Sequence, residues 1–166
     1  IALEYKPDVC VIWFFVNDFH SPGDLREFGY LGGVNILPEA RERSRVLDVF
    51  AAPFDNMITE RKLTRAYETI YAEDYPGYRR GKSALEEFAV LCRENNVVPV
   101  LAMHPIMGML GENYPFKHAH EKVKAICAEN GINSVDMFPL FKGKNARELW
   151  VHPADYHPNH VANRIA

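Results

Sequence analysis

Val9-Cys-Val-Ile-Trp-Phe-Phe-Val16, with Asn17-Asp18 directly after it, is the stretch from which the architecture of this 166-residue chain is best predicted. The apolar run is far shorter than the roughly 20 residues that a membrane-spanning helix needs. It is apolar on both alternating faces, which is typical of a parallel strand covered by helices on each side. The sequence therefore predicts a buried parallel strand that ends at Asn17.

Two helix and strand pairs follow later in the chain. Apolar residues recur at helical spacing over Ser83–Glu94, and the apolar run Val97–Met103 comes next. Ala119–Glu129 repeats the helical pattern and leads into a short strand, Ile132–Met137. Pro99 cannot donate to a neighbouring strand, so we place it near the start of its strand or at an edge. Strand, helix, strand, helix, strand is the rhythm of an α/β sheet with right-handed connections.

Residues 19–80 form an insertion of about sixty residues, far longer than the usual connection of roughly 4–6 residues. Pro38-Glu39 predicts a helix start and Pro53 a break, and a second helical pattern covers residues 63–71. The two helices could act as a lid or could simply belong to the outer layer. The many aromatic residues of the insertion could likewise line a lipid or glycan site or form part of the core.

Composition excludes several classes of protein. With 48% hydrophobic and 25% charged residues the chain resembles an ordinary globular domain rather than a disordered or fibrous protein. The net charge of −3 gives no general attraction to nucleic acid. Cys10, Cys92 and Cys127 are widely separated in apolar segments, which indicates buried thiols rather than disulfides or a zinc site. We expect one domain over residues 1–166, with no transmembrane segment.

Candidate chemistry lies in two polar segments. Asn17-Asp18 follows a strand, and functional groups in open α/β sheets gather at the carboxyl ends of the strands. Asp155 lies two residues before His157, close enough for a carboxylate to orient the imidazole as a general base. Asn17 offers an amide donor of the kind that stabilises an oxyanion. Each motif also has a structural reading, because Asn and Asp are common in turns and Asn159 could cap a helix.

Together these segments resemble a known family. Lys6–Asp18 and Asp155–Asn159 are similar to the third and fifth conserved blocks of the SGNH (GDSL-type) hydrolases, and the similarity extends through Met103-His-Pro105 and Val135–Pro139. The resemblance implies a flavodoxin-like three-layer α/β/α domain with a parallel sheet and a serine nucleophile in a G-D-S motif on its first strand. It makes Asn17 an oxyanion-hole donor, and it places the catalytic base and its orienting acid in the fifth block, at His157 and Asp155.

The chain departs from this family at several positions. None of its serines, Ser21, Ser44, Ser83 and Ser134, stands in a G-D-S setting after a strand. Phe15 stands where the family's G-x-N-D pattern has glycine, and Asp155 precedes His157 by two residues where many members have three. The resemblance covers only the later part of the family's domain, so we expect the first strand and the serine block upstream of Ile1.

The resemblance predicts an ester hydrolase that works through a serine acyl-enzyme, with no metal or other cofactor. Its substrate would be a small-molecule, glycan or lipid ester. An O-acyltransferase on the same scaffold, or a binding module that has lost catalysis, are the alternatives. A metal site at Asp155, His157 and His160 is a weaker alternative, because a metal needs three or four converging ligands. His104 and His152, each before a proline, are predicted to be loop residues near the crevice.

Three predicted strands are fewer than the roughly 5–6 of a typical sheet. We therefore expect residues 1–166 to form most of a domain rather than all of one. Such a piece would expose apolar sheet and helix surface, and we expect it to be poorly soluble or to self-associate.

Overall fold

The computed structural model describes residues 2–20, 43–111, 114–152 and 155–166. Three parallel strands form its main sheet: β1 (Val9–Phe15), β2 (Val98–His104) and β3 (Asn133–Asp136), in the order β1-β2-β3. The register runs from Val9 opposite Val98 to Phe15 opposite His104, so β1 and β2 end side by side. The structure confirms the mixed α/β class predicted from the sequence.

Pro99 lies where the sequence predicted it, near the start of its strand. It is the second residue of β2, which is the central strand of the sheet. Its carbonyl oxygen accepts a hydrogen bond from the side-chain amide of Asn133, at 3.3 Å. Because proline lacks an N–H, its position near the end of the ladder costs the sheet little.

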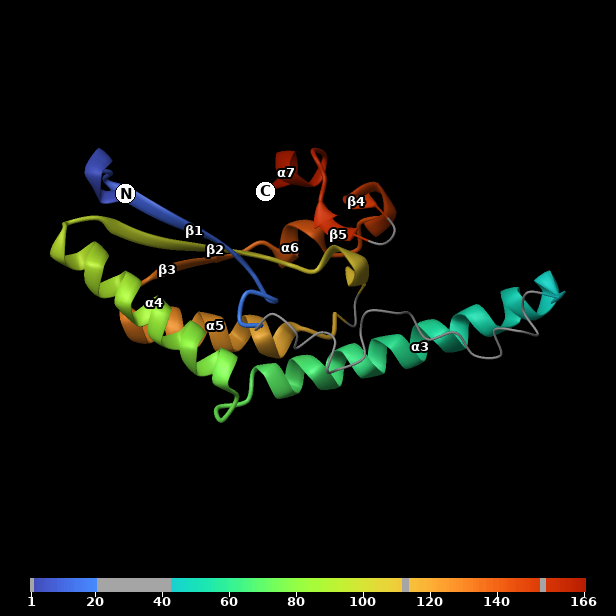
Figure 1. The fold of residues 1–166 in the computed structure, drawn as a ribbon. Helices are drawn as coiled ribbons and strands as arrows, with labels where there is room; N and C mark the ends of the chain where they lie inside the picture. Colours follow the sequence, from blue (N-terminus) through green and yellow to red (C-terminus); the bar gives the residue numbers. More distant parts are fainter. Residues whose placement is uncertain (1, 21–42, 112–113, 153–154) are drawn as a thin grey trace.

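Helices cover one face of this sheet (Figure 1). They are α4 (Pro76–Glu94) and α5 (Lys117–Asn130), together with the C-terminal part of α3 (Arg45–Ile70). α4 begins at Pro76, where a proline is already set for the first turn, and so it starts earlier than the predicted Ser83. α5 ends at Gly131, whose φ of 72° is the left-handed conformation that glycine adopts without steric cost.

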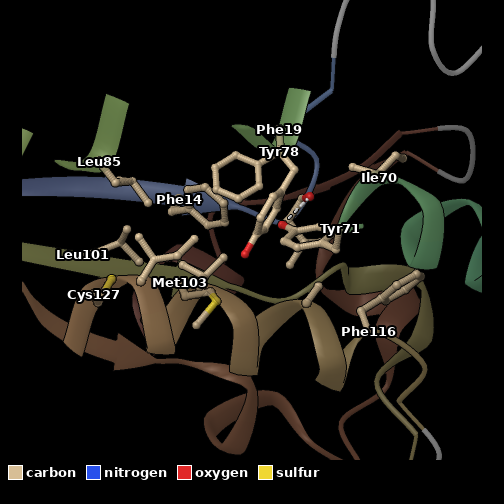
Figure 2. Packing of buried hydrophobic residues seen from close by; sticks show 14 of the residues in the cluster. Phe14, Phe19, Ile70, Tyr71, Tyr78, Leu85, Leu101, Met103, Phe116 and Cys127 are labelled. Carbon is tan, nitrogen blue, oxygen red and sulfur yellow. Dashed lines mark hydrogen bonds between the residues drawn. The ribbon is translucent and has the colours of Figure 1, made fainter. Parts of the chain in front are cut away.

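The main core lies between these helices and the sheet (Figure 2). It contains alternate residues of β1 and β2, such as Phe14 and Leu101, because side chains two apart on a strand share a face. Three tyrosines of the predicted insertion, Tyr67, Tyr71 and Tyr78, are buried in this core. The sequence allowed the aromatic residues of the insertion to line a lipid or glycan site or to form part of the core. These three tyrosines belong to the core.

Helix α3 differs from the sequence-based prediction. It continues as one helix through Pro53, where we predicted a break. A proline inside a helix removes one backbone donor and often kinks the helix without ending it, and the alanines at 51 and 52 favour helix on its N-terminal side. Figure 1 shows the N-terminal half of α3 projecting beyond the other elements. The predicted start at Pro38 lies outside the described residues.

Among the described residues, those that cover the second face of the sheet lie near the carboxyl ends of the strands. The short elements there are α6 (Phe138–Phe141), η3 (Ala146–Glu148) and α7 (Ala162–Ile165), which share a smaller core with Ala102. Several apolar side chains of this face are exposed: Val9, Val11, Trp13, Val98 and Val135.

The polar segment that carries His152 and His157 forms an antiparallel ribbon. Its strands are β4 (Trp150–His152) and β5 (Asp155–Pro158), paired at Trp150 with Pro158 and at His152 with Asp155. The prediction of His152 as a loop residue was therefore wrong. Alternation of apolar and polar residues was too brief here to reveal strands.

The remaining predictions about composition can be compared directly. Cys92 and Cys127 are buried free thiols and Cys10 is half-buried, which agrees with the sequence analysis. Within the described ranges, every helix is too short or too polar to cross a membrane. The short helices η1 (Ala2–Tyr5) and η2 (Met107–Met109) complete the fold.

Candidate functional site

Asn17 and Asp18 lie in a tight turn at the carboxyl end of β1. The N–H of Asp18 donates to the carbonyl oxygen of Phe15 at 2.9 Å, and the N–H of His20 donates to that of Asn17 at 3.0 Å. Oδ2 of Asp18 accepts a hydrogen bond from the N–H of Phe15, also at 2.9 Å. The Asp18 side chain therefore closes the turn that presents Asn17 at the edge of the sheet.

Buried contacts hold this turn on both sides. The hydroxyl of Tyr71 donates to the carbonyl oxygen of Val16 at 2.8 Å, and Val16 is fully buried (Figure 2). Phe19 packs against the rings of Tyr71 and Tyr78. A Cβ at Gly77 of α4 would collide with the backbone carbonyl of Phe19, so only glycine permits this close approach.

His157 lies at the same edge. It is an exposed residue of β5, and its ring centroid is 6.0 Å from that of Phe15, with the planes at 70°. The structure therefore brings His157 next to the strand end that carries Asn17, although the two residues are far apart in the chain. The side chain of Asp155 lies outside the described part of the structure, and its predicted role stays a prediction.

The charge of His157 affects the pKa of the Asp18 carboxyl. Desolvation raises the pKa of Asp18 above its ordinary value, while the hydrogen bond from Phe15 and the charge of His157 act in the opposite direction. Desolvation exceeds the two opposing effects, so the net shift is upward. An acidic and a basic group therefore lie within electrostatic reach of each other at the carboxyl end of β1.

His104 is the last residue of β2 and is fully buried, so the prediction of a loop position was wrong. Its Nδ1 lies 3.1 Å from the carbonyl oxygen of Pro105, which can only accept, so Nδ1 carries the hydrogen. Nε2 has no hydrogen-bond partner among the described residues. The ring packs between Trp13, Phe15 and Phe141, and burial lowers its pKa. His104 is therefore a neutral imidazole beneath Phe15.

A second polar group lies at the end of β3, and the association of its members was not predicted from the sequence. Nδ1–H of His120 donates to Oδ1 of Asp136 at 2.9 Å, and the Tyr114 hydroxyl lies 3.1 Å from Nε2 of His120. The N–H of Ile106 donates to the Tyr114 oxygen at 3.0 Å. With Nδ1–H donating to Asp136, the neutral imidazole of His120 has its acceptor at Nε2, and the Tyr114 hydroxyl donates to it.

We call Asp136, His120 and Tyr114 the buried relay. Burial favours the neutral acid at Asp136, but the hydrogen bonds from His120 and from the N–H of Phe138, together with the charges of His120 and Lys124, outweigh this and lower its pKa. Burial raises the pKa of Tyr114, which keeps the phenol a donor. A cavity of about 260 Å³ adjoins the relay and is lined by Tyr114, Lys117, His120, Glu121, Asp136 and Phe138.

The sequence held a signal for the buried relay. His120 falls in the first turns of a predicted helix, and Asp136 ends a predicted strand. In a strand-helix-strand unit the helix runs antiparallel to the strands, so its amino end lies beside the carboxyl end of the strand that follows it. The proximity of His120 and Asp136 could therefore have been inferred from the sequence. The choice between a metal ligand and a buried hydrogen-bonded histidine depended on the tertiary contacts.

Asn159 has the structural role that the sequence left open. Its Oδ1 accepts from the N–H groups of Val161 and Ala162, at 2.9 and 3.1 Å, and so caps the start of α7. Its Nδ2 donates to the carbonyl oxygens of Glu148 and Trp150. These bonds anchor the segment that follows His157.

None of the described serines directly follows a strand of the main sheet, where the family resemblance would place the nucleophile. Ser83 lies in α4, Ser134 lies in β3 opposite Leu101, and Ser44 directly precedes α3. Ser21 lies outside the described residues. Across the described ranges, no cluster of three His, Cys, Asp or Glu side chains is arranged to hold a metal ion.

Comparison of this chain with protein-family models, with curated proteins and with solved structures finds no match.

Proposed function

We propose that this chain is the later part of an ester hydrolase of SGNH type. His157 acts as general base, Asp155 orients it and Asn17 donates to the oxyanion. The nucleophilic serine comes from sequence outside these 166 residues. One observation carries the proposal: the ring of His157 lies against Phe15, two residues before Asn17, at the carboxyl end of a parallel strand.

The surroundings of these residues support the same reading. The turn at Asn17 is held by Tyr71 and by buried neighbours, which favours a preorganised donor. His157 is exposed, as a base that must reach a substrate has to be. The Asn159 cap and its bonds to Glu148 and Trp150 support the backbone just beyond His157.

In the proposed reaction the serine oxygen attacks the ester carbonyl carbon while His157 takes the serine proton. Asn17 donates a hydrogen bond to the oxyanion that forms. The carbon–oxygen bond to the alcohol then breaks, and the alcohol leaves with the proton from His157. Water repeats the same steps on the acyl-enzyme, which releases the acid and restores the serine.

The test uses the complete parent chain, with fluorophosphonate labelling and turnover of p-nitrophenyl acetate. We expect labelling of one serine, and a loss of about 10²-fold or more in kcat for His157→Gln, since general bases contribute on that scale. His160→Gln is the matched control, because His160 is an exposed histidine three residues away. An intact parent chain that is neither labelled nor dependent on His157 would overturn the proposal.

The 166-residue chain provides a further check. It should show no hydrolysis that fluorophosphonate inhibits, because none of its serines follows a strand in a G-D-S setting. Robust inhibitable turnover by this piece would contradict the proposed source of the nucleophile.

A non-catalytic binding module remains the second candidate, favoured by the positions of Ser44, Ser83 and Ser134 in other parts of the fold. A parent chain without a strand followed by G-D-S would favour it. If the protein is an enzyme, the acceptor of the acyl group distinguishes a hydrolase from an acyltransferase. An acyltransferase would transfer the acyl group to an added sugar hydroxyl faster than to water.

A further inference from the structure

Asp18 and His157 meet at one residue, Phe15. The carboxylate of Asp18 accepts a hydrogen bond from the backbone N–H of Phe15 at 2.9 Å. The imidazole of His157 lies against the ring of the same residue, 6.0 Å between centroids. The turn thus fixes the carboxylate and the ring contact fixes the imidazole, each relative to the end of β1.

We propose that Asp18 stabilises the protonated form of His157 during turnover, as a second carboxylate supplied by β1 rather than by β5. This inference rests on the proposed function, in which His157 accepts a proton from the serine and becomes an imidazolium. A nearby anion favours that charged state. Because Asp18 acts through space on His157, it is a positioning residue and does not touch the reacting atoms.

The surroundings of Asp18 single out His157 as its cationic partner. The groups that act on the Asp18 carboxyl are the N–H of Phe15 and His157, and Asp18 in turn acts on the Tyr71 hydroxyl. Of these groups, within the described chain, only His157 can carry a positive charge. A positive charge that forms on His157 during a reaction would therefore be compensated by Asp18.

Asp155 does not make Asp18 redundant. A carboxylate directly hydrogen-bonded to an imidazole sets its tautomer and orientation, whereas a more distant one contributes only to the stability of the charge. The hydrogen bond that Asp18 accepts from the N–H of Phe15 gives its side chain a structural role in the turn. The same bond holds the carboxylate near His157, so one side chain serves both purposes.

The first experiment measures the coupling without any activity. The carboxyl of Asp18 is titrated by ¹³C NMR in the 166-residue chain and in its His157→Gln variant. We expect the pKa of Asp18 to rise in the variant, because the charge that lowers it is gone. His160→Gln is the control and should leave the titration unchanged. An Asp18 titration that His157→Gln does not alter would overturn the proposal.

The second experiment measures turnover of p-nitrophenyl acetate by the complete parent chain. Asp18→Asn keeps an oxygen that can accept from Phe15, so the turn is preserved while the charge is removed. We expect kcat to fall about tenfold with little change in KM, which is less than the roughly 10²–10⁴-fold that a general base itself contributes. Asp18→Glu should restore part of the loss. Asp8→Asn, an exposed position at the amino end of β1, is the control.

The two experiments separate this inference from the proposed function. If His157→Gln leaves turnover unchanged, the hydrolase proposal fails whatever the NMR titration shows. If His157→Gln abolishes turnover but Asp18→Asn behaves like Asp8→Asn, only the role of Asp18 is overturned. Should Asp18→Asn unfold the chain, the titration in His157→Gln decides the question alone.

Discussion

Phe15 shows how one side chain can set the environment of several others. It stands where the resembled family has glycine, and its ring contacts both the buried His104 and the exposed His157. From sequence, this position was only a departure from a pattern. In the structure it is the contact between the end of β1 and the ribbon β4–β5, which is why the departure matters for the candidate site.

A second residue-scale contact is the hydrogen bond from Tyr71 to the carbonyl oxygen of Val16. Tyr71→Phe removes the donor and leaves a buried carbonyl without its partner, which costs about 1–3 kcal/mol. Urea unfolding of the two proteins measures this difference in the free energy of unfolding. Tyr5→Phe, at a residue that is 82% exposed, is the control. Equal stability of Tyr71→Phe and wild type would contradict a structural role for this bond.

At the scale of elements, the buried relay joins the ends of β2 and β3 to the first turns of α5. Tyr114 binds Ile106, and Asp136 binds Phe138, so loops from two strands are tied through His120. The helix η2 that follows Ile106 lies against β5, the strand that carries His157. The relay is therefore linked, through Ile106 and η2, to the ribbon on which the candidate base lies.

The relay also predicts a pH dependence of stability. The pKa of Asp136 is lowered in the folded state, so its contribution is fully present above the unfolded value of about 3.9. It is lost as the pH falls from there through the folded pKa. We expect Asp136→Asn to be less stable than wild type at pH 6, and this difference to shrink as the pH approaches 3. Urea midpoints across that range measure it.

Asp8→Asn is a suitable control for this pH series, because Asp8 is exposed at the opposite end of the sheet. Its stability should follow that of wild type at every pH. A stability difference for Asp136→Asn that stays constant from pH 6 to pH 3 would show that the charge of Asp136 contributes nothing.

At the scale of the whole molecule, helices of the described ranges cover one face of the sheet and leave apolar side chains exposed on the other. Parallel sheets are normally buried on both faces, yet Val9, Val11, Trp13, Val98 and Val135 are exposed here. β1 is also an edge strand of the described sheet. Exposed apolar surface beside a free strand edge favours association.

We therefore expect the 166-residue chain to self-associate at concentrations on the order of 100 μM. Substituting Val11→Thr and Val98→Thr together keeps β-branched side chains but reduces apolar surface, and should shift the sedimentation profile toward monomer. Val161→Thr, at an exposed valine away from the main sheet, is the matched control. A wild-type chain that sediments as a monomer at that concentration would contradict the expectation.

The order along the chain of the three main-sheet strands and of α4 and α5 followed from the sequence alone, as did the place of Asn17 at the end of β1 and of Pro99 near the start of β2. These features depend on hydrophobic periodicity and on backbone chemistry over a few residues, which local sequence encodes. The path of α3 through Pro53 and the pairing of β4 with β5 depended on longer-range packing, and the sequence prediction was wrong there.

The contacts of the candidate site were decided by the tertiary structure. That His157 lies on Phe15, that Asp18 lies within its electrostatic reach and that His120 is buried between Asp136 and Tyr114 could not be read from spacing. Each contact joins segments whose distance depends on how helices and strands pack together. Sequence periodicity determines which face of a helix or strand is buried. Only the tertiary packing determines which residue of another element contacts that face.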